Sequence, residues 1–213
     1  MSTGSDTRDR IMTAAERLFA RKGIDAVSIR DITGAARANT AAIHYHFGSK
    51  HALIESILER RAADLGRRRA ALLAQIESDP SATLRDVVAA VVIPTAELAA
   101  DTRHGGRHYV GFLAAVLAHP RYMARLIDIY EPHTSRYMAA LERVTPHLRA
   151  DVRELRWALA KDLVNRTLGY GTHGNRRGPV HAWLERHAPG ADDALPDRLI
   201  DFLTGAFAAP AQS

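Results

Sequence analysis

The sequence predicts an all-α fold, and three features of the chain support this prediction. Apolar residues recur three or four positions apart through most of its length, the spacing that lines one face of an α-helix. Ser, Thr, Asp or Asn residues precede several of these apolar runs, where their side chains can cap the first turn of a helix. No segment shows the alternation of apolar and polar residues that is typical of a strand.

The first two helices begin at recognisable caps. The first is expected to start at Asp6 or Thr7 and to end before Gly23, which adopts a left-handed helix end at little cost. The second starts at Ser28, which has the capping-box spacing to Asp31. The inward face of the first helix carries Ile11, Ala15, Leu18 and Phe19.

A third short helix is expected over residues 39–45, about three residues after the second. A fourth covers residues 49–78, with Ser49 as its cap. The arginine run 67–69 and the polar segment 77–80 mark where this fourth helix fades. The sequence thus predicts a small domain over residues 1–50 that the helix 49–78 links to a larger helical domain over residues 51–213.

The remaining chain predicts longer helices with irregular junctions. We expect Pro94 to kink one of them, because proline removes an amide donor, and Pro132 to begin a new helix. Residues 172–194, rich in Gly, Pro and His, are expected to form a loop around one short helix. The expected helices span residues 83–100, 106–118, 121–130, 132–144, 146–171, 180–186 and 195–208.

The basic charge of the chain leans toward its N-terminus. Of the formal net charge of +5, residues 1–50 contribute +3, from eight basic and five acidic side chains. Such an excess suits a polyanionic partner, although many soluble proteins are mildly basic.

Composition excludes several other classes of protein. The chain has no cysteine, which rules out disulfides, thiolate metal sites and cysteine nucleophiles. The polar start MSTGSDTRDR lacks the apolar core of a signal peptide, and no stretch approaches the roughly 18 consecutive apolar residues of a membrane span. We therefore expect no membrane partner and a cytoplasmic localisation.

Residues 29–50 have the layout of a helix-turn-helix. Two short helices joined by about three residues are too small to form a core, but the first can brace the second against the major groove of DNA. The outward side of the second helix is expected to carry Asn39, Thr40, Ala41 and His44. Its inward side is expected to carry Ala42, Ile43 and Phe47.

The end of this unit carries Ile43 followed by the string YHFGSK at residues 45–50. After two short helices, these residues resemble the N-terminal domain of TetR-type (tetracycline-repressor-like) transcriptional regulators. The resemblance covers residues 8–60, and beyond about residue 65 only the helical layout supports it. Arg37 stands where the family usually has a turn glycine, and Ala38 where it usually has valine. A non-glycine residue in a left-handed turn costs roughly 1–2 kcal/mol, which a phosphate contact by Arg37 could offset.

The resemblance implies DNA contacts by residues on and beside the two short helices. Ser28 and Arg30 would touch backbone phosphate, because helix N-termini suit anions. Tyr45 and Lys50 would hold the DNA backbone and position the protein without reading sequence. The residues that would reach bases or nearby phosphates are Asn39, Thr40, Ala41 and His44.

Each of these roles has a simpler alternative. Tyr45, His46 and Phe47 could be core aromatics that link the third and fourth helices, an interpretation that we prefer for His46 and Phe47. Lys50 could be a solvated surface charge, as most lysines are. His44 and His46 suggest a metal site, but positions i and i+2 diverge on a helix, so we predict no metal there.

The resemblance also implies a helical body that dimerises through its last two long helices and encloses a small-molecule pocket. Both of these helices carry two apolar stripes where a surface helix needs one, which indicates burial on two sides. One side can face a symmetry mate, although a core helix in a monomer would show the same pattern. The residues expected at the dimer interface are Leu155, Leu159, Leu163, Leu199, Phe202 and Leu203.

A largely apolar pocket with a few polar anchors is expected within the body. Each of its candidates could instead be a packing residue. His104 and His108 at i and i+4, with Asp101 nearby, offer an alternative metal site, but we predict neither a metal nor a cofactor. The candidate pocket residues are Arg107, His108, Tyr109, Phe112, Tyr130, His133, Tyr137 and Trp157.

These patterns predict a regulator and no enzyme. The sequence has no G-x-S-x-G elbow, no phosphate-cradling glycine-rich loop, no H-E-x-x-H and no Glu-x-x-His pair, so we assign no catalytic residue. We expect a homodimeric repressor that a small apolar or aromatic effector releases from a palindromic operator in double-stranded DNA. The alternative is a DNA-binding activator or structural binder without an effector.

Overall fold

The computed structural model describes residues 3–103, 105–170, 178–188, 190–191 and 193–211. This described part is helical and contains no strand, as the sequence predicts. None of its helices is long and apolar enough to cross a membrane. In chain order the helices are α1 (Thr3–Lys22), α2 (Ile29–Ala36), α3 (Thr40–Phe47), α4 (Lys50–Ser78), α5 (Leu84–Ala100), α6 (Gly106–Leu117), the 3-10 helix η1 (Pro120–Tyr122), α7 (Met123–Val144), α8 (Ala150–Tyr170), α9 (Pro179–His187) and α10 (Leu195–Ala208).

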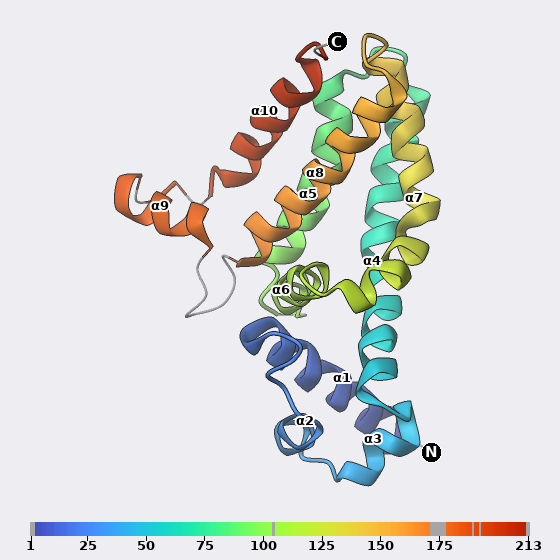
Figure 1. Ribbon diagram of the computed structural model, residues 1–213, viewed down its shortest axis with the longest axis vertical. Coiled ribbons are helices and arrows are strands. Elements are labelled where there is room, and N and C mark those ends of the chain that lie inside the picture. The colour runs from blue at the N-terminus through green and yellow to red at the C-terminus, as the bar shows by residue number, and fades with distance from the viewer. Residues whose placement is uncertain (1–2, 104, 171–177, 189, 192, 212–213) are drawn as a thin grey trace.

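The helices form a small N-terminal domain and a larger body that meet at α6. In Figure 1, α1, α2 and α3 lie together at the lower end, and α4 rises from them along the body beside α7. Helices α5, α8 and α10 form the other side of the body, with α9 projecting from it. Helix α6 lies across the junction and packs against α1 below and against α5 and α8 above.

The N-terminal domain has a core of its own. Ile11 and Phe19 of α1 are fully buried with Ile32 of α2, Ile43 of α3 and Leu53 of α4. These residues come from the apolar face of each short helix, so the domain follows from local helical periodicity. The first helix begins at Thr3, earlier than the cap expected at its start.

Helix α4 ends at Ser78, as the sequence predicts, but it does not fade at the arginine run 67–69. Arg69 follows Leu65 by four positions and precedes Leu73 by four, so it lies on the buried face between them. Only 7% of Arg69 is exposed. A buried arginine is uncommon in proteins.

Two prolines lie inside continuous helices. Pro94 lies within α5 and has no amide hydrogen to donate to the carbonyl of Ala90, four residues earlier. This carbonyl instead accepts a hydrogen bond from the Tyr137 hydroxyl at 2.7 Å. Pro132 was expected to begin a new helix, but α7 runs through it without a break. That expectation is therefore wrong.

The helix boundaries near the C-terminal end agree with the sequence, with one shift. Helix α8 begins at Ala150 and not at residue 146, because the amide of Leu148 turns back to the carbonyl of Thr145 at 3.1 Å. The short helix expected over residues 180–186 is confirmed as α9. The final helix is confirmed as α10 with the expected bounds.

Candidate nucleic-acid interface and ligand cavity

Helix α3 divides into a buried and an exposed side as its sequence predicts. Ile43 is fully buried, whereas Tyr45 is 86% exposed. Asn39 caps the start of the helix, and its side chain accepts a hydrogen bond from the amide of Ala42 at 2.8 Å. Phe47 is half-buried, which agrees with a packing role. The other exposed residues of this side are Asn39, Thr40, Ala41 and His44.

Several of the predicted contact residues also hold the local structure together. The Ser28 hydroxyl donates to the Asp31 carboxylate at 2.6 Å, and the amide of Asp31 donates back to the Ser28 oxygen at 3.1 Å. The hydroxyl and the amide of Ser28 both donate to the Asp31 carboxylate, and these two bonds lower the pKa of Asp31. His44 Nδ1 lies 3.1 Å from the carbonyl of Gly48 at the end of α3, so the ring is oriented by the backbone. The Ser28 side chain accepts from one amide at the start of α2, that of Asp31. The remaining amides of this helix end and the exposed Arg30 side chain can bind an anion.

The turn between α2 and α3 keeps its left-handed form even though it contains no glycine. Arg37 has φ 50° and ψ 46°, the left-handed region that favours glycine. Its amide donates to Gly34 O at 3.3 Å, and the amide of Ala38 donates to Thr33 O at 3.0 Å, the pattern of a Schellman helix end. The side chain of Arg37 is exposed beside α3.

Lys50 differs from the other predicted DNA contacts. Its Nζ donates to the carbonyl of Ile24 at 2.6 Å and lies 5.7 Å from the ring centre of Phe19. Partial burial lowers the pKa of the Lys50 ammonium, and the charge of Asp25 opposes this shift. Lys50 therefore ties the start of α4 to the loop between α1 and α2.

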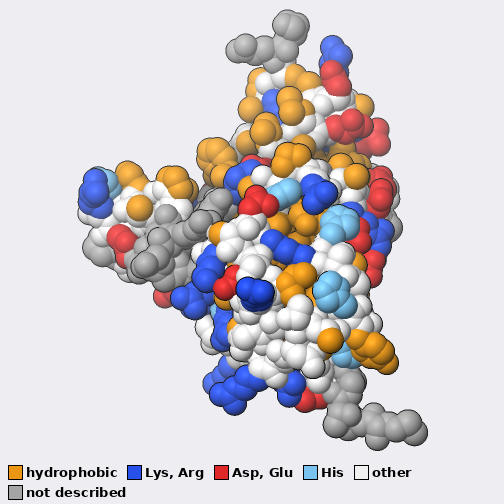
Figure 2. Space-filling model, turned by 60° about the horizontal axis from the view of Figure 1, so that its bottom comes forward, with side chains coloured by type: hydrophobic (Ala, Val, Ile, Leu, Met, Phe, Trp, Pro, Cys, Tyr) orange, Lys and Arg blue, Asp and Glu red, His pale blue; other side chains and the backbone are white. Residues whose placement is uncertain are grey.

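The face that carries α2 and α3 is basic in character. Figure 2 brings this end of the molecule forward and shows Lys and Arg side chains on its left and centre, histidines on its right and few carboxylates. A surface of this kind suits the phosphate backbone of a nucleic acid.

A cavity of about 310 Å³ lies in the body between α4, α6, α7 and α8. Four of the eight predicted pocket residues line it: Tyr130, His133, Tyr137 and Trp157. The rings of Tyr137 and Trp157 pack at 4.8 Å between centres. Leucines from α6 and α7 complete the apolar wall, namely Leu113, Leu117 and Leu126.

The other four predicted pocket residues lie outside this cavity. Arg107 donates to the carbonyl of Ala99 at 3.3 Å, and Phe112 packs on Phe19 at 5.9 Å between ring centres. Tyr109 is buried behind the wall, where its hydroxyl bonds that of Tyr130. His108 is half-buried, and burial lowers its pKa. The structure therefore assigns these four residues to packing around α6.

Sequence reasoning missed the polar side chains of the cavity. Arg69 of α4 and Lys161 and Asn165 of α8 also line it. A signal for Arg69 was present, because a charge that continues the apolar stripe of a helix at four-residue spacing is directed toward the core. Because Arg69 lies in a run of three arginines, its place on the apolar face of α4 was not recognised.

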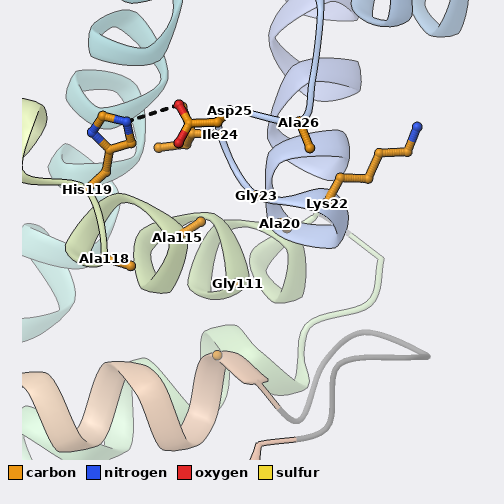
Figure 3. Close-up of a pocket in the computed structure, with 11 residues that line it drawn as sticks. Ala20, Lys22, Gly23, Ile24, Asp25, Ala26, Gly111, Ala115, Ala118 and His119 are labelled. Carbon is orange, nitrogen blue, oxygen red and sulfur yellow. Dashed lines mark hydrogen bonds and ion pairs between the residues drawn. The ribbon is translucent and has the colours of Figure 1, made fainter.

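A second cavity, of about 290 Å³, lies where the N-terminal domain meets the body. Figure 3 shows the loop after α1 facing α6, with Ala115 directed toward the loop and His119 joined to Asp25. His119 Nε2 and the Asp25 carboxylate are 3.2 Å apart. Gly169 of α8 also lines this cavity, and an added Cβ there would come within 2.8 Å of the Val110 carbonyl of α6.

Two family profiles match the chain. Residues 11–57 match the bacterial regulatory proteins of the tetR family, and residues 89–206 match the tetracyclin repressor-like C-terminal domain. The second match alone covers more than half of the 213 residues. The chain belongs to the TetR family. Its members are transcriptional regulators and not enzymes, as the sequence predicts.

Curated relatives of this TetR-family protein match it through part of their length. The transcriptional repressor NicS of Pseudomonas putida is 37% identical over 83 residues, which make up 39% of either chain. The transcriptional regulator AcrR of Shigella flexneri is 31% identical over 90 residues, 42% of either chain. The chain thus aligns with about two fifths of the length of these relatives.

Solved structures share the fold over nearly the whole chain. AmtR of Mycobacterium smegmatis has a TM-score of 0.59 at 16% identity, covering 96% of this chain and 87% of AmtR. GusR of Salmonella enterica has a TM-score of 0.54 at 21% identity, covering 95% and 96%. The multidrug binding protein EbrR, in complex with malachite green, has a TM-score of 0.54 at 21% identity, covering 90% and 96%.

The TetR-family body leaves part of its apolar surface uncovered. Leu155 and Leu159 on α8 are each 61% exposed, and Phe202 on the neighbouring α10 is 65% exposed. The second stripe of α8 is buried, as the doubled pattern predicts: Trp157, Ala160, Val164 and Leu168. Leu163 is half-buried. Leu199 and Leu203, also expected at an interface, are buried inside the protomer, so the structure moves them from the interface to the core.

The alternative metal site near α6 depends on a residue whose structure is not described. His104 lies outside the described residues. Among the residues that are described, no three His, Cys, Asp or Glu side chains are grouped so that they could hold a metal ion.

Proposed function

We propose that this TetR-family protein binds a two-fold symmetric operator as a homodimer and is released from it by a small molecule. The observation that carries the proposal is the exposed side of α3, where Thr40, Ala41, His44 and Tyr45 are presented by a helix that Ile43 anchors in the core. A short, braced helix of this kind fits the major groove.

The contacts divide into those that position and those that read sequence. Arg30 and Arg37 are exposed beside α3 and suit phosphates, and Tyr45 suits the sugar-phosphate backbone. Thr40 and His44 are the side chains that we assign to base edges. Lys50 holds the loop between α1 and α2 in place through its hydrogen bond to the Ile24 carbonyl, and the other N–H groups of its ammonium can bind a phosphate. Ala41 allows close approach, while Ser28 and Asn39 keep the helix ends in place.

The homodimer is supported by the uncovered face of α8 and α10. Leu155, Leu159 and Phe202 expose large apolar side chains on adjacent helices, and such patches mark association sites. Leu163 continues the face as a half-buried residue. A two-fold interface there would place one α3 from each subunit on the same DNA, with half-sites roughly 34–36 Å apart.

Helix α6 offers a physical route from the ligand cavity to the DNA-binding domain. Leu113 and Leu117 line the cavity, whereas Gly111 and Ala115 of the same helix line the junction with the α1–α2 loop. A ligand that binds one placement of α6 better than another would therefore shift the placement of α3. The complex of EbrR with malachite green supports the proposal that this fold receives small molecules.

The DNA-binding role is tested by selecting duplexes from a random library with the purified protein. Thr40→Ala and His44→Ala are expected to change which bases are preferred, by about 1–3 kcal/mol for each good contact. Tyr45→Phe and Lys50→Ala are expected to weaken binding to all sequences alike. Arg30→Ala should reduce the salt dependence of binding by about one phosphate contact, unlike Arg67→Ala on the outer side of α4. An unchanged base preference in both α3 variants would overturn the assignment.

The effector role is tested separately. A small-molecule library is first screened for compounds that raise the melting temperature, because a ligand of the folded state stabilises it by mass action. Each hit is then titrated with and without saturating operator. A differential of about 3 kcal/mol lowers DNA affinity roughly 100-fold, and by reciprocity the operator weakens ligand binding equally. Equal affinities for every hit would favour the second candidate, a DNA-binding regulator without an effector.

A further inference from the structure

Arg69 is a buried cation whose hydrogen bonds are incomplete. Its Nη2 donates to the Thr95 hydroxyl at 3.1 Å, and its Nε has no partner. Within the described part of the chain it forms no ion pair with a carboxylate. A buried guanidinium of this kind is costly unless a negative charge approaches it. Because Arg69 lines the cavity of about 310 Å³, a ligand in that cavity could supply this charge.

Other polar atoms of the cavity are also unpaired or basic. Trp157 Nε1 is buried without a hydrogen-bond partner, and so is Asn165 Oδ1, while the amide nitrogen of Asn165 donates to the Lys161 carbonyl at 2.8 Å. The ammonium of Lys161 lies 5.3 Å from the ring centre of Trp157. Burial lowers the pKa of both Lys161 and His133, and in each case the charge of Arg69 lowers it further. The cavity therefore has a positive interior with spare donors.

The two carboxylates that border the cavity do not neutralise it. Asp162 is bonded to Arg166 at 2.7 Å, and its side chain is 49% exposed. Glu131 is exposed as well. Exposed carboxylates are screened by solvent, whereas a buried guanidinium is not.

We propose that the effector is an organic anion, with an apolar or aromatic body and a carboxylate that pairs with Arg69. This inference rests on the proposed function of the cavity as the effector site. Leu113, Leu117 and Leu126 provide the apolar wall, and Arg69 presents the fork geometry that binds carboxylate through two hydrogen bonds. Trp157 Nε1 supplies a further donor, and Asn165 Oδ1 accepts from a hydroxyl of the ligand.

The charge preference can be measured with acids and their neutral amides, which differ little in shape. The pairs are benzoate and benzamide, 2-naphthoate and 2-naphthamide, and octanoate and octanamide. By titration calorimetry on the full chain, at least one acid should bind more tightly than its amide by roughly 10- to 100-fold. Equal binding within every pair, or no binding of any acid at about 1 mM, would overturn the proposal.

Variants test whether Arg69 causes the preference. Arg69→Met keeps the length of the side chain without its charge and should bind acid and amide equally, whereas Arg69→Lys should keep part of the preference. Arg68→Met is the matched control, because Arg68 neighbours it in α4 but is exposed and paired with Asp64 and Glu97. The ligand-free Arg69→Met protein should melt at or above the wild-type temperature, since an unpaired buried charge has been removed. A retained preference in Arg69→Met would contradict the assignment.

Gel-shift titration with operator then separates this proposal from the effector role. If the acids bind through Arg69 but leave operator affinity unchanged, the anion site stands and effector control fails. If only neutral compounds bind and release the operator, effector control stands and the anion site fails.

Discussion

Polar residues of the DNA-binding domain serve the fold and the surface at once. Asn39 both caps α3 and lies at its exposed start, so replacing it by alanine would lower stability by about 1 kcal/mol before any DNA contact is lost. Ser28 combines the same two functions at α2. Thr40 is a better probe of recognition, because α3 does not depend on it as a cap, whereas His44 lies against the Gly48 carbonyl at the end of the helix.

The left-handed turn at Arg37 can be tested by a glycine substitution. Arg37→Gly is expected to raise the free energy of unfolding by up to about 1 kcal/mol, because glycine adopts φ 50° without a Cβ penalty. DNA affinity should fall for all sequences alike if the guanidinium binds phosphate. Urea denaturation measures the first effect, and gel-shift titration measures the second.

The matched control lies seven residues earlier in the sequence, inside α2. Arg30→Gly places glycine at a right-handed helical position in the first turn of α2 and should lower the free energy of unfolding by up to roughly 0.5–1 kcal/mol. A loss of stability in Arg37→Gly as well would show that the turn does not strain the arginine.

The helices of the body are held by a few specific contacts between elements. In α5, Pro94 frees the Ala90 carbonyl, and Tyr137 of α7 reaches across to satisfy it. Between α8 and α6, Gly169 allows the two backbones to approach closely. Each contact places the walls of the cavity with respect to one another.

Tyr137→Phe is expected to destabilise the protein by about 1–3 kcal/mol, because it leaves the buried Ala90 carbonyl without a donor. Burial raises the pKa of Tyr137 to about 12, so this group stays protonated in the folded protein while an unfolded tyrosine ionises near pH 10. Its contribution to stability is present below about pH 10 and is lost as pH rises toward about 12. The variant should flatten that alkaline loss in urea titrations, whereas Tyr45→Phe, at an exposed site, should not.

Gly169→Ala is expected to lower the free energy of unfolding by about 1–3 kcal/mol, because its Cβ would lie 2.8 Å from the Val110 carbonyl and 2.9 Å from the Ala114 Cβ. Gly34→Ala is the control, since nothing lies within 4 Å of the added atom and the helix gains roughly 0.5–1 kcal/mol. Thermal melting of both variants decides the matter. Equal melting temperatures would mean that α6 and α8 can separate without cost.

At the scale of the whole molecule, α6 joins the N-terminal domain to the body, in addition to the continuous helix α4 that runs through both. Helix α6 contacts the N-terminal domain through α1 and the body through α5 and α8. The ligand cavity and the junction cavity lie on its two sides. Any change in its placement therefore reaches both the ligand and the DNA-binding helix.

The proposed dimer can be tested by placing a charge in its expected interface. Leu159→Glu places a charge in the uncovered apolar face of α8 and should convert a dimer into a monomer, as light scattering at micromolar concentration would show. Tyr45→Glu is the control, because Tyr45 is 86% exposed on α3, a helix that packs against α1, α2 and α4 in the N-terminal domain. A wild-type monomer, with and without DNA, would contradict the proposed dimer.

Most of the helices, the exposed side of α3 and the family could be predicted from the sequence, because periodicity, caps and the YHFGSK string are local signals. The partner that covers each helix face depends on long-range packing. Arg69 is buried because α5 lies against α4, and Lys50 turns inward because Ile24 offers it a carbonyl. Leu203 belongs to the core because α5 covers its side of α10, while Phe202 beside it stays exposed. An apolar stripe in the sequence predicts that a helix face is covered, but only long-range packing determines which element covers it.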